Sequence, residues 1–303
     1  MVLITGATGT VGSSILRILA RQGEPVRAMT RDPQRIPASL SGVEVARADF
    51  DDPPSLLQAV RGVDAIFLMS APASPTARHE LAMLEAARAG GVRRIVKLSA
   101  IGTGETIDGV TLGPWHLQSE QALRVGGFDW TVLRPSVFAS NFLWWADAIA
   151  SGRPISNLTG ASVQGVVDPR DVAGVAVEAL LSTTHRGRTY TLTGPDLLSV
   201  PDQAALLTEV LGFPVRSGDT PLDKARTQML ASGMDAEVVD VMITGLAWTR
   251  AGHNAVITDD VERVLGRPPT SFETWCRDHR AAFGAGQDLG SKSIGPPGAR
   301  ARQ

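Results

Sequence analysis

The first twelve residues constrain the fold of this chain more than any other stretch. They read MVLITGATGTVG, in which a short apolar run ends in Thr5 and glycines recur at Gly6, Gly9 and Gly12. Residues 13–21 then carry apolar side chains at helical spacing. The segment therefore predicts a buried strand, a tight glycine turn and the start of a helix.

This order of elements suits the pyrophosphate of a dinucleotide. Glycines allow the turn, the approach of backbone N–H groups to the phosphates, and close packing of helix on strand. The helix N-terminus offers unpaired N–H groups and a partial positive charge to the anion. Glycine triplets also mark ordinary turns, but here the strand before and the helix after supply the required context. The predicted phosphate-binding residues are Gly6, Thr8, Gly9, Thr10, Val11 and Gly12.

Strand and helix patterns alternate after this motif. Apolar runs predict strands at 25–31, 43–48, 64–70, 94–100 and 129–135, and helical spacing predicts helices at 54–61, 76–89 and 115–125. The alternation predicts an α/β fold with a doubly wound parallel sheet, Rossmann-like, and ligands outside the carboxyl ends of its strands.

The pattern loosens after Pro135. Residues 138–151 look helical and aromatic-rich, 163–167 and 188–193 look strand-like, and helices are expected at 172–181, 200–211 and 222–231. We interpret 1–283 as one unit. Residues 1–150 form its NADP-binding core, and 151–283 form mainly a smaller mixed substrate lobe, interleaved with the last sheet strands. Residues 284–303, rich in Gly, Pro, Ser and Arg, are expected to be a disordered tail.

Composition narrows the function classes. The net charge of −2 argues against a nucleic-acid partner, and the single cysteine, Cys276, excludes a disulfide framework and a cysteine-rich metal site. No apolar run reaches the ~20 residues of a membrane span. The first strand begins so early that we expect no signal peptide, and the cytoplasm is the expected location. We also expect no metal.

The end of the second predicted strand indicates which nicotinamide cofactor binds. An acid at this place would hold the ribose of NAD, but the chain has Thr30 followed by Arg31, whose guanidinium suits the 2′-phosphate of NADP. Asp32 is the alternative acid, although its place before Pro33 favours a turn cap. We predict NADP. Ser70, Ala71 and Pro72 end the fourth strand, where the backbone would pass the ribose.

Several segments together resemble the NmrA-like atypical branch of the short-chain dehydrogenase/reductase superfamily. They are 5–9 (TGATG), 97–100 (KLSA), 115–120 (WHLQSE), 130–135 (WTVLRP), 168–173 (DPRDVA), 187–195 (GRTYTLTGP) and 272–275 (FETW). The resemblance implies that Asp49 and Phe50 contact adenine. It also implies that the segment carrying Pro135, Ser136 and Phe138 holds the nicotinamide carboxamide.

The usual catalytic pair of that superfamily, Tyr-x-x-x-Lys, is absent. The single tyrosine is Tyr190, and Leu112 and His116 stand where the Tyr and Lys would be. Ser99 matches the family serine and is a second catalytic candidate. His116 can bind the ribose or donate a proton; alternatively, it is a packed imidazole satisfied by Glu120, one helical turn away.

Without that pair, hydride transfer suits acceptors that delocalise the developing charge, such as quinones, dyes and polycyclic aromatic ketones. The aromatic residues predicted to bind substrate are Phe138, Phe142, Trp144 and Trp145. Three of them share one face at helical spacing and Trp144 points elsewhere; the alternative is a core contact of the lobe.

The sequence thus favours an NADPH-dependent oxidoreductase that acts on an aromatic carbonyl or quinone-type small molecule, a polyketide-tailoring ketoreductase being one instance. A non-catalytic NADP(H)-binding redox sensor of the NmrA type is the alternative. A third hypothesis is an isomerase or dehydratase with a tightly held cofactor.

Overall fold

The centre of the molecule is a seven-stranded sheet in the order β3-β2-β1-β4-β5-β8-β11. The computed structural model describes residues 1–40, 42–70, 76–107 and 109–284. The strands are β1 (Val2–Ile4), β2 (Val26–Thr30), β3 (Val43–Arg47), β4 (Ala65–Leu68), β5 (Arg94–Leu98), β8 (Asp129–Pro135) and β11 (Arg188–Leu192). Every neighbouring pair is parallel. The predicted doubly wound sheet is confirmed, with its reversal of strand order between β1 and β4.

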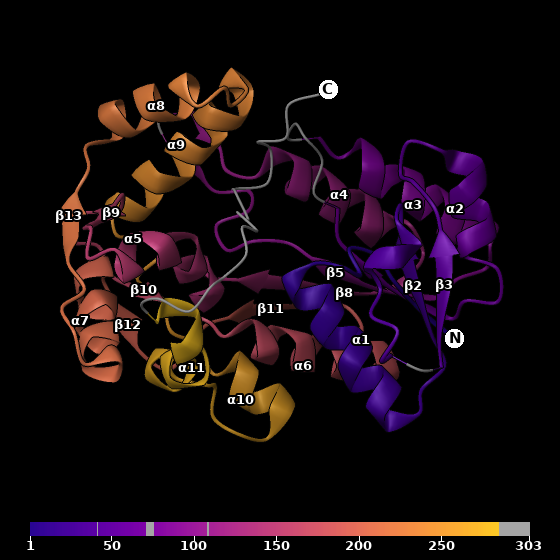
Figure 1. The fold of residues 1–303 in the computed structure, drawn as a ribbon. Coiled ribbons are helices and arrows are strands. Elements are labelled where there is room, and N and C mark those ends of the chain that lie inside the picture. The colour runs from indigo at the N-terminus through magenta and orange to yellow at the C-terminus, as the bar shows by residue number, and fades with distance from the viewer. Residues whose placement is uncertain (41, 71–75, 108, 285–303) are drawn as a thin grey trace.

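Helices cover both faces of this sheet (Figure 1). On one face, α1 (Thr10–Gln22) packs beside α6 (Pro169–Leu181), and on the other lie α2 (Pro53–Ala59), α3 (Arg78–Ala89) and α4 (Pro114–Val125). Short helical turns η1 (Pro33–Arg35) and η3 (Thr183–His185) follow β2 and α6. A two-stranded hairpin, β6 (Thr106–Ile107) and β7 (Val110–Thr111), lies between β5 and α4.

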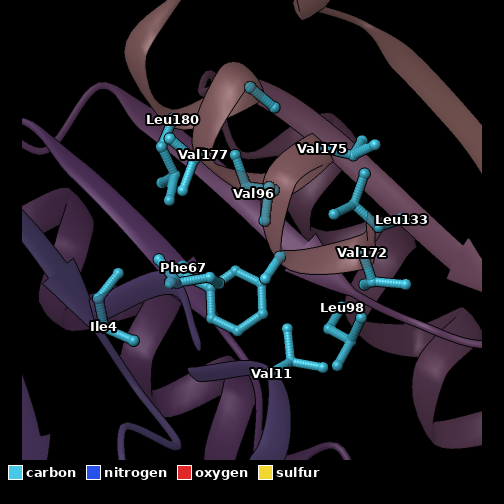
Figure 2. Packing of buried hydrophobic residues seen from close by; sticks show 14 of the residues in the cluster. Ile4, Val11, Phe67, Val96, Leu98, Leu133, Val172, Val175, Val177 and Leu180 are labelled. Carbon is cyan, nitrogen blue, oxygen red and sulfur yellow. The ribbon is translucent and has the colours of Figure 1, made fainter. Parts of the chain in front are cut away.

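The core under α1 and α6 is built from strand residues that alternate in direction. Figure 2 shows Phe67 among Ile4, Val11 and Leu98, with the apolar face of α6 packed on Val96 and Leu133. Most of these side chains are completely buried. Each contributes roughly 1.5–3 kcal/mol of transfer free energy.

The smaller lobe, in the left half of Figure 1, starts after β8 and contains most of the remaining elements. Its first part is η2 (Ala139–Trp145), α5 (Ala146–Ala150), β9 (Ile155–Asn157) and β10 (Gln164–Gly165). Its second part is β12 (Leu197–Leu198), α7 (Val200–Leu211), β13 (Ser217–Asp219), α8 (Leu222–Ala231), α9 (Ala236–Arg250), α11 (Phe272–Asp278) and η4 (Arg280–Phe283). Strand β10 pairs with β12 and β9 with β13. Between these two parts of the chain, α6 and β11 return to the sheet. Helix α10 (Asp260–Leu265), between α9 and α11 in the sequence, packs on α6.

One expectation for this region needs correction. The stretch 138–151 begins as a 3-10 helix, so its aromatic residues do not follow α-helical spacing. Residues of η2 and α5 pack in the same core as α7 and α11. Of the expected tail, 285–303 lie outside the described residues.

The turn after β1 is held by close backbone approach. Gly6 has φ +59°, a conformation that favours glycine, and a Cβ added at Gly12 would lie 2.3 Å from the Gly6 carbonyl oxygen. Thr5 links the turn to β4, since its hydroxyl donates to the Met69 carbonyl and accepts from the Met69 N–H, both at 2.8 Å. Helix α1 therefore starts at the place where the strand order reverses.

This close approach makes Gly12 intolerant of even one methyl group. We expect Gly12→Ala to lower the free energy of unfolding by ~1–3 kcal/mol, because the added Cβ overlaps fixed backbone. Gly245→Ala is the matched control, since Gly245 also lies in a helix and a Cβ there would meet nothing within 4 Å. Urea unfolding measures both, and an equal response of the two variants would contradict the expectation.

Candidate active site

The N-terminus of α1 is the predicted binding place for the cofactor pyrophosphate. Gly9 is its N-cap, no side chain caps the helix there, and its first turn carries no acidic residue. The amide groups and the helix dipole are therefore left for an anion. The glycine turn fits the pyrophosphate of a nicotinamide dinucleotide as the sequence predicts.

The residues predicted to contact the adenine half of the cofactor lie at the carboxyl ends of β2 and β3. Arg31 directly follows β2 and is exposed. Asp32 accepts a hydrogen bond from the N–H of Gln34 and caps η1, so its carboxylate has the turn-capping role that the sequence favoured. Phe50 stacks on His79, with ring centroids 5.3 Å apart, and the Asp49 carboxylate accepts from the Asp51 N–H.

A buried ion pair lies at the carboxyl end of β5. Lys97 is completely buried, and its ammonium group bonds Glu80 of α3, itself 2% exposed, at 2.5 Å. The Lys97 Nζ also lies 3.2 Å from the Leu98 carbonyl oxygen and 3.4 Å from Nδ1 of His116. The Oγ of Ser70 lies 3.5 Å from Glu80. This arrangement connects the ends of β4 and β5 to α4.

His116 reaches this cluster because α4 starts abruptly. Gly113 adopts a left-handed conformation, and Pro114 opens the helix, which places His116 in the first turn. Burial, together with the charges of Lys97 and Arg134, lowers the pKa of His116 to about 3. Its imidazole is therefore neutral at physiological pH and is satisfied by Lys97, not by Glu120.

Glu120 belongs to a second cluster beside the first. Its carboxylate is completely buried and accepts from Ser99 at 2.6 Å, from Arg134 at 2.7 Å and from Arg124 at 2.8 Å. Burial raises the pKa of Glu120, but the hydrogen bonds from Arg134 and Ser99 and the charge of both arginines outweigh it, and the pKa lies below its usual value. The Ser99 hydroxyl proton is committed to this carboxylate.

The segment after β8 is held by buried polar contacts. Ser136 donates to Oδ1 of Asn254 at 3.0 Å, and Asn254 donates to Gln164 at 3.0 Å. Pro135 ends β8, and Phe138 forms a parallel bridge with Val167. The backbone here is thus fixed between sheet and lobe.

The four aromatic residues separate into different surroundings. Phe138 packs against the core under α1 and α6, whereas Phe142 contacts Trp145 and Phe272 in the core of the lobe. Phe142 and Trp145 therefore lie together as predicted, and Phe138 does not share their face. Trp144 is 51% exposed. Phe142 has the position of a core residue, which supports the alternative interpretation for that ring.

Helix α9 is anchored beside the site. The indole N–H of Trp248 donates to Glu105 at 2.8 Å, in the loop after β5. Gly102 of the same loop has φ +76°, and a Cβ there would lie 2.8 Å from the Trp248 ring. The loop that follows Ser99 is thereby fixed to the lobe.

The structure brings Ser99, His116, Ser70 and the Ser136 segment to one edge of the sheet, and Ala71 and Pro72 lie outside the described residues. Sequence reasoning missed Glu80, Arg134 and the role of Lys97. The available indication was a lysine inside an otherwise apolar strand, which needs a buried partner.

Comparison with known proteins agrees with this geometry. A family model described as NAD(P)H-binding matches residues 6–183, which is more than half of the chain. The chain belongs to the NAD(P)H-binding family. The resemblance to the NmrA-like atypical short-chain group and the nicotinamide cofactor are both confirmed.

Relatives of this family member include named reductases. A reductase from Streptomyces griseus, named "(4-alkanoyl-5-oxo-2,5-dihydrofuran-3-yl)methyl phosphate reductase", is 38% identical over 283 residues, which cover 93% of this chain and 99% of the relative. An NAD(P)H azoreductase from Xenophilus azovorans is 32% identical over 286 residues, which cover 94% of this chain and 100% of the relative. The protein is therefore an NAD(P)H-dependent oxidoreductase, and the sensor hypothesis is not favoured.

Solved structures show the same fold. The NADPH-dependent quinone oxidoreductase of Escherichia coli, complexed with NADPH, superposes with a TM-score of 0.81 at 22% identity, over 93% of this chain and 100% of the other. The triphenylmethane reductase of Citrobacter sp., complexed with NADP(H), superposes with a TM-score of 0.79 at 22% identity, over 92% of this chain and 99% of the other.

Within the described ranges, no helix has the length and apolar character needed to cross a membrane. Nor do the described side chains contain a cluster of three or more His, Cys, Asp or Glu suited to a metal ion.

The low pKa of His116 predicts acid sensitivity. Below pH 6.5 the unfolded chain protonates this histidine while the folded protein does not until about pH 3, so stability falls across that range. We expect His116→Gln to remove this contribution. Relative to the wild type, the free energy of unfolding of the variant should rise by roughly 1 kcal/mol for each pH unit below pH 6.5.

Urea unfolding at several pH values between 7.5 and 4.5 measures the difference. His253→Gln removes an exposed histidine and serves as the reference variant. A stability difference between His116→Gln and wild type that does not change with pH would contradict a neutral, desolvated His116.

Proposed function

We propose that this protein is an NADPH-dependent reductase that transfers a hydride to an electron-poor conjugated small molecule, of the aromatic carbonyl or quinone type. The observation that carries the proposal is the 38% identity to a reductase over 99% of that relative's length. The site must then bind a flat acceptor beside the nicotinamide.

The names of the relatives have a chemical feature in common. An oxo-dihydrofuran with an acyl group, an azo compound and a quinone are all conjugated acceptors. In each, a hydride can enter one end of the π system while the negative charge spreads to oxygen or nitrogen. Such acceptors do not need a strong acid beside the reacting carbon.

The polar groups of this site match that requirement. His116 is neutral, and in the described part of the chain its Nε2 has no hydrogen-bond partner. Ser99 is 5% exposed and donates to Glu120. We therefore assign to His116 the role of a hydrogen-bond donor to the developing oxyanion, and to Ser99 a supporting role.

The cofactor would be held by the residues named above. The turn from Gly6 to Gly12 would bind the pyrophosphate, Arg31 the 2′-phosphate, and the segment from Pro135 to Phe138 the carboxamide. When bound, NADPH supplies the hydride. Trp144, exposed on η2 after β8, is the residue we propose as a wall or lid for a flat substrate. We keep the cytoplasm as the proposed location.

The direct test is NADPH oxidation with a panel of naphthoquinones, anthraquinones, azo dyes and acyl butenolides. Turnover of at least one conjugated acceptor, and none of simple aliphatic ketones, is the expected result. Tight NADPH binding without turnover of any acceptor would overturn the proposal in favour of a sensor.

Arg31 should decide between the two nicotinamide cofactors. We expect Arg31→Ala to weaken NADPH binding by ~10-fold or more and to leave NADH binding little changed, because only NADPH carries the 2′-phosphate. Isothermal titration of both cofactors measures this, with Arg35→Ala, a neighbouring exposed arginine, as control. Equal losses for NADPH and NADH would contradict the assignment.

A further inference from the structure

The buried lysine of β5 has three N–H groups and three acceptors. Lys97 Nζ lies 2.5 Å from Glu80 Oε2, 3.2 Å from the Leu98 carbonyl oxygen and 3.4 Å from His116 Nδ1. An ammonium group donates only and cannot accept. Because Lys97 is 0% exposed, no water replaces a missing acceptor at its surface.

This donor count decides where the proton of His116 lies. If Nδ1 carried it, an N–H would face an ammonium, and one N–H of Lys97 would lose its acceptor inside the protein. Both consequences are costly in a buried place. If Nε2 carries the proton, Nδ1 accepts from Lys97, and each of the three N–H groups of Lys97 has an acceptor.

We infer that Lys97 is a positioning residue that holds His116 in the Nε2–H tautomer and so presents an N–H donor to the substrate oxygen. Only the second part, donation of the N–H to a substrate oxygen, rests on the proposed function. Hydride arrival breaks the C–H bond of the reduced cofactor and forms a C–H bond on the acceptor, while the charge moves to the acceptor oxygen. His116 stabilises this oxygen through Nε2–H and keeps its proton, and solvent water supplies the proton that neutralises the product.

The charged groups around His116 support this arrangement. From β5 comes Lys97, balanced by Glu80 of α3, and from β8 comes Arg134, balanced by Glu120 of α4 itself. Neither carboxylate forms a hydrogen bond to the imidazole. The two cations nearest the ring therefore disfavour a second proton on it, so a neutral donor is maintained across the working pH range.

The test reads the tautomer directly in the cofactor-free, full-length protein. Histidine labelled with ¹⁵N in the ring gives separate long-range ¹H–¹⁵N patterns for the two tautomers, and the pattern missing from His116→Gln assigns the residue. The expected result is the Nε2–H pattern, unchanged between pH 5 and 8. An Nδ1–H pattern, or titration in that range, overturns the inference.

A double variant tests the part played by Lys97. Lys97→Met with Glu80→Met removes both charges and keeps apolar bulk, because losing one partner alone would leave a buried charge. The expected result is a mixture of tautomers at His116, while His185, held by Tyr190 at 2.9 Å, keeps its pattern. Lys224→Met, which removes an exposed lysine on α8, is the control and should change neither.

Kinetics separate the inference from the proposed function. In the double variant we expect kcat to fall by roughly 10-fold and KM for NADPH to change much less, since among the described residues the glycine turn and Arg31 form no hydrogen bond to Lys97 or Glu80. A double variant that keeps the pure Nε2–H pattern and unchanged kcat overturns the role of Lys97. If the wild type shows the expected tautomer but reduces no acceptor, the proposed function fails while the positioning of His116 stands.

Discussion

The contact between Gly12 and the carbonyl of Gly6 is the constraint on which the cofactor site depends. It brings α1 against the end of β1 at a separation that no side chain permits. The N-terminus of α1 is thereby placed between β1 and β4, where Thr5 joins the two strands. Since α1 also packs along α6, the same contact aligns the helical layer that covers β5 and β8.

The other half of the site depends on charge that is buried and fully paired. Lys97 with Glu80, and Glu120 with two arginines, are ionised groups with little or no exposure of the carboxylates. Burying them costs free energy that apolar residues would not require, so their value lies in geometry rather than stability. They hold the ends of β5 and β8 against α3 and α4, and they fix the surroundings of one neutral imidazole.

Most of the sheet was predictable, because buried parallel strands such as β4 leave an apolar run and strand and helix patterns alternate; β8 was found with its limits, 129–135. The glycine turn and the Asp32 cap were also predictable, because each depends only on residues that are neighbours in the sequence. The Lys97 cluster was not, since its members come from α3, β5 and α4, and sequence spacing does not show which helix lies over which strand end. The aromatic residues misled for a related reason: a 3-10 turn places Phe138 and Phe142 in two different cores.

The path of the chain has a consequence for how such proteins diversify. After its first excursion into the lobe the chain returns to complete the sheet with α6 and β11, and only then builds the rest of the lobe. The lobe is thus built from two separate segments of the chain that must fold together. A single crossover that exchanges the whole lobe also exchanges α6 and β11 of the sheet, so new substrate preferences are expected to accumulate through point substitutions and loop-length changes rather than through exchange of the lobe alone.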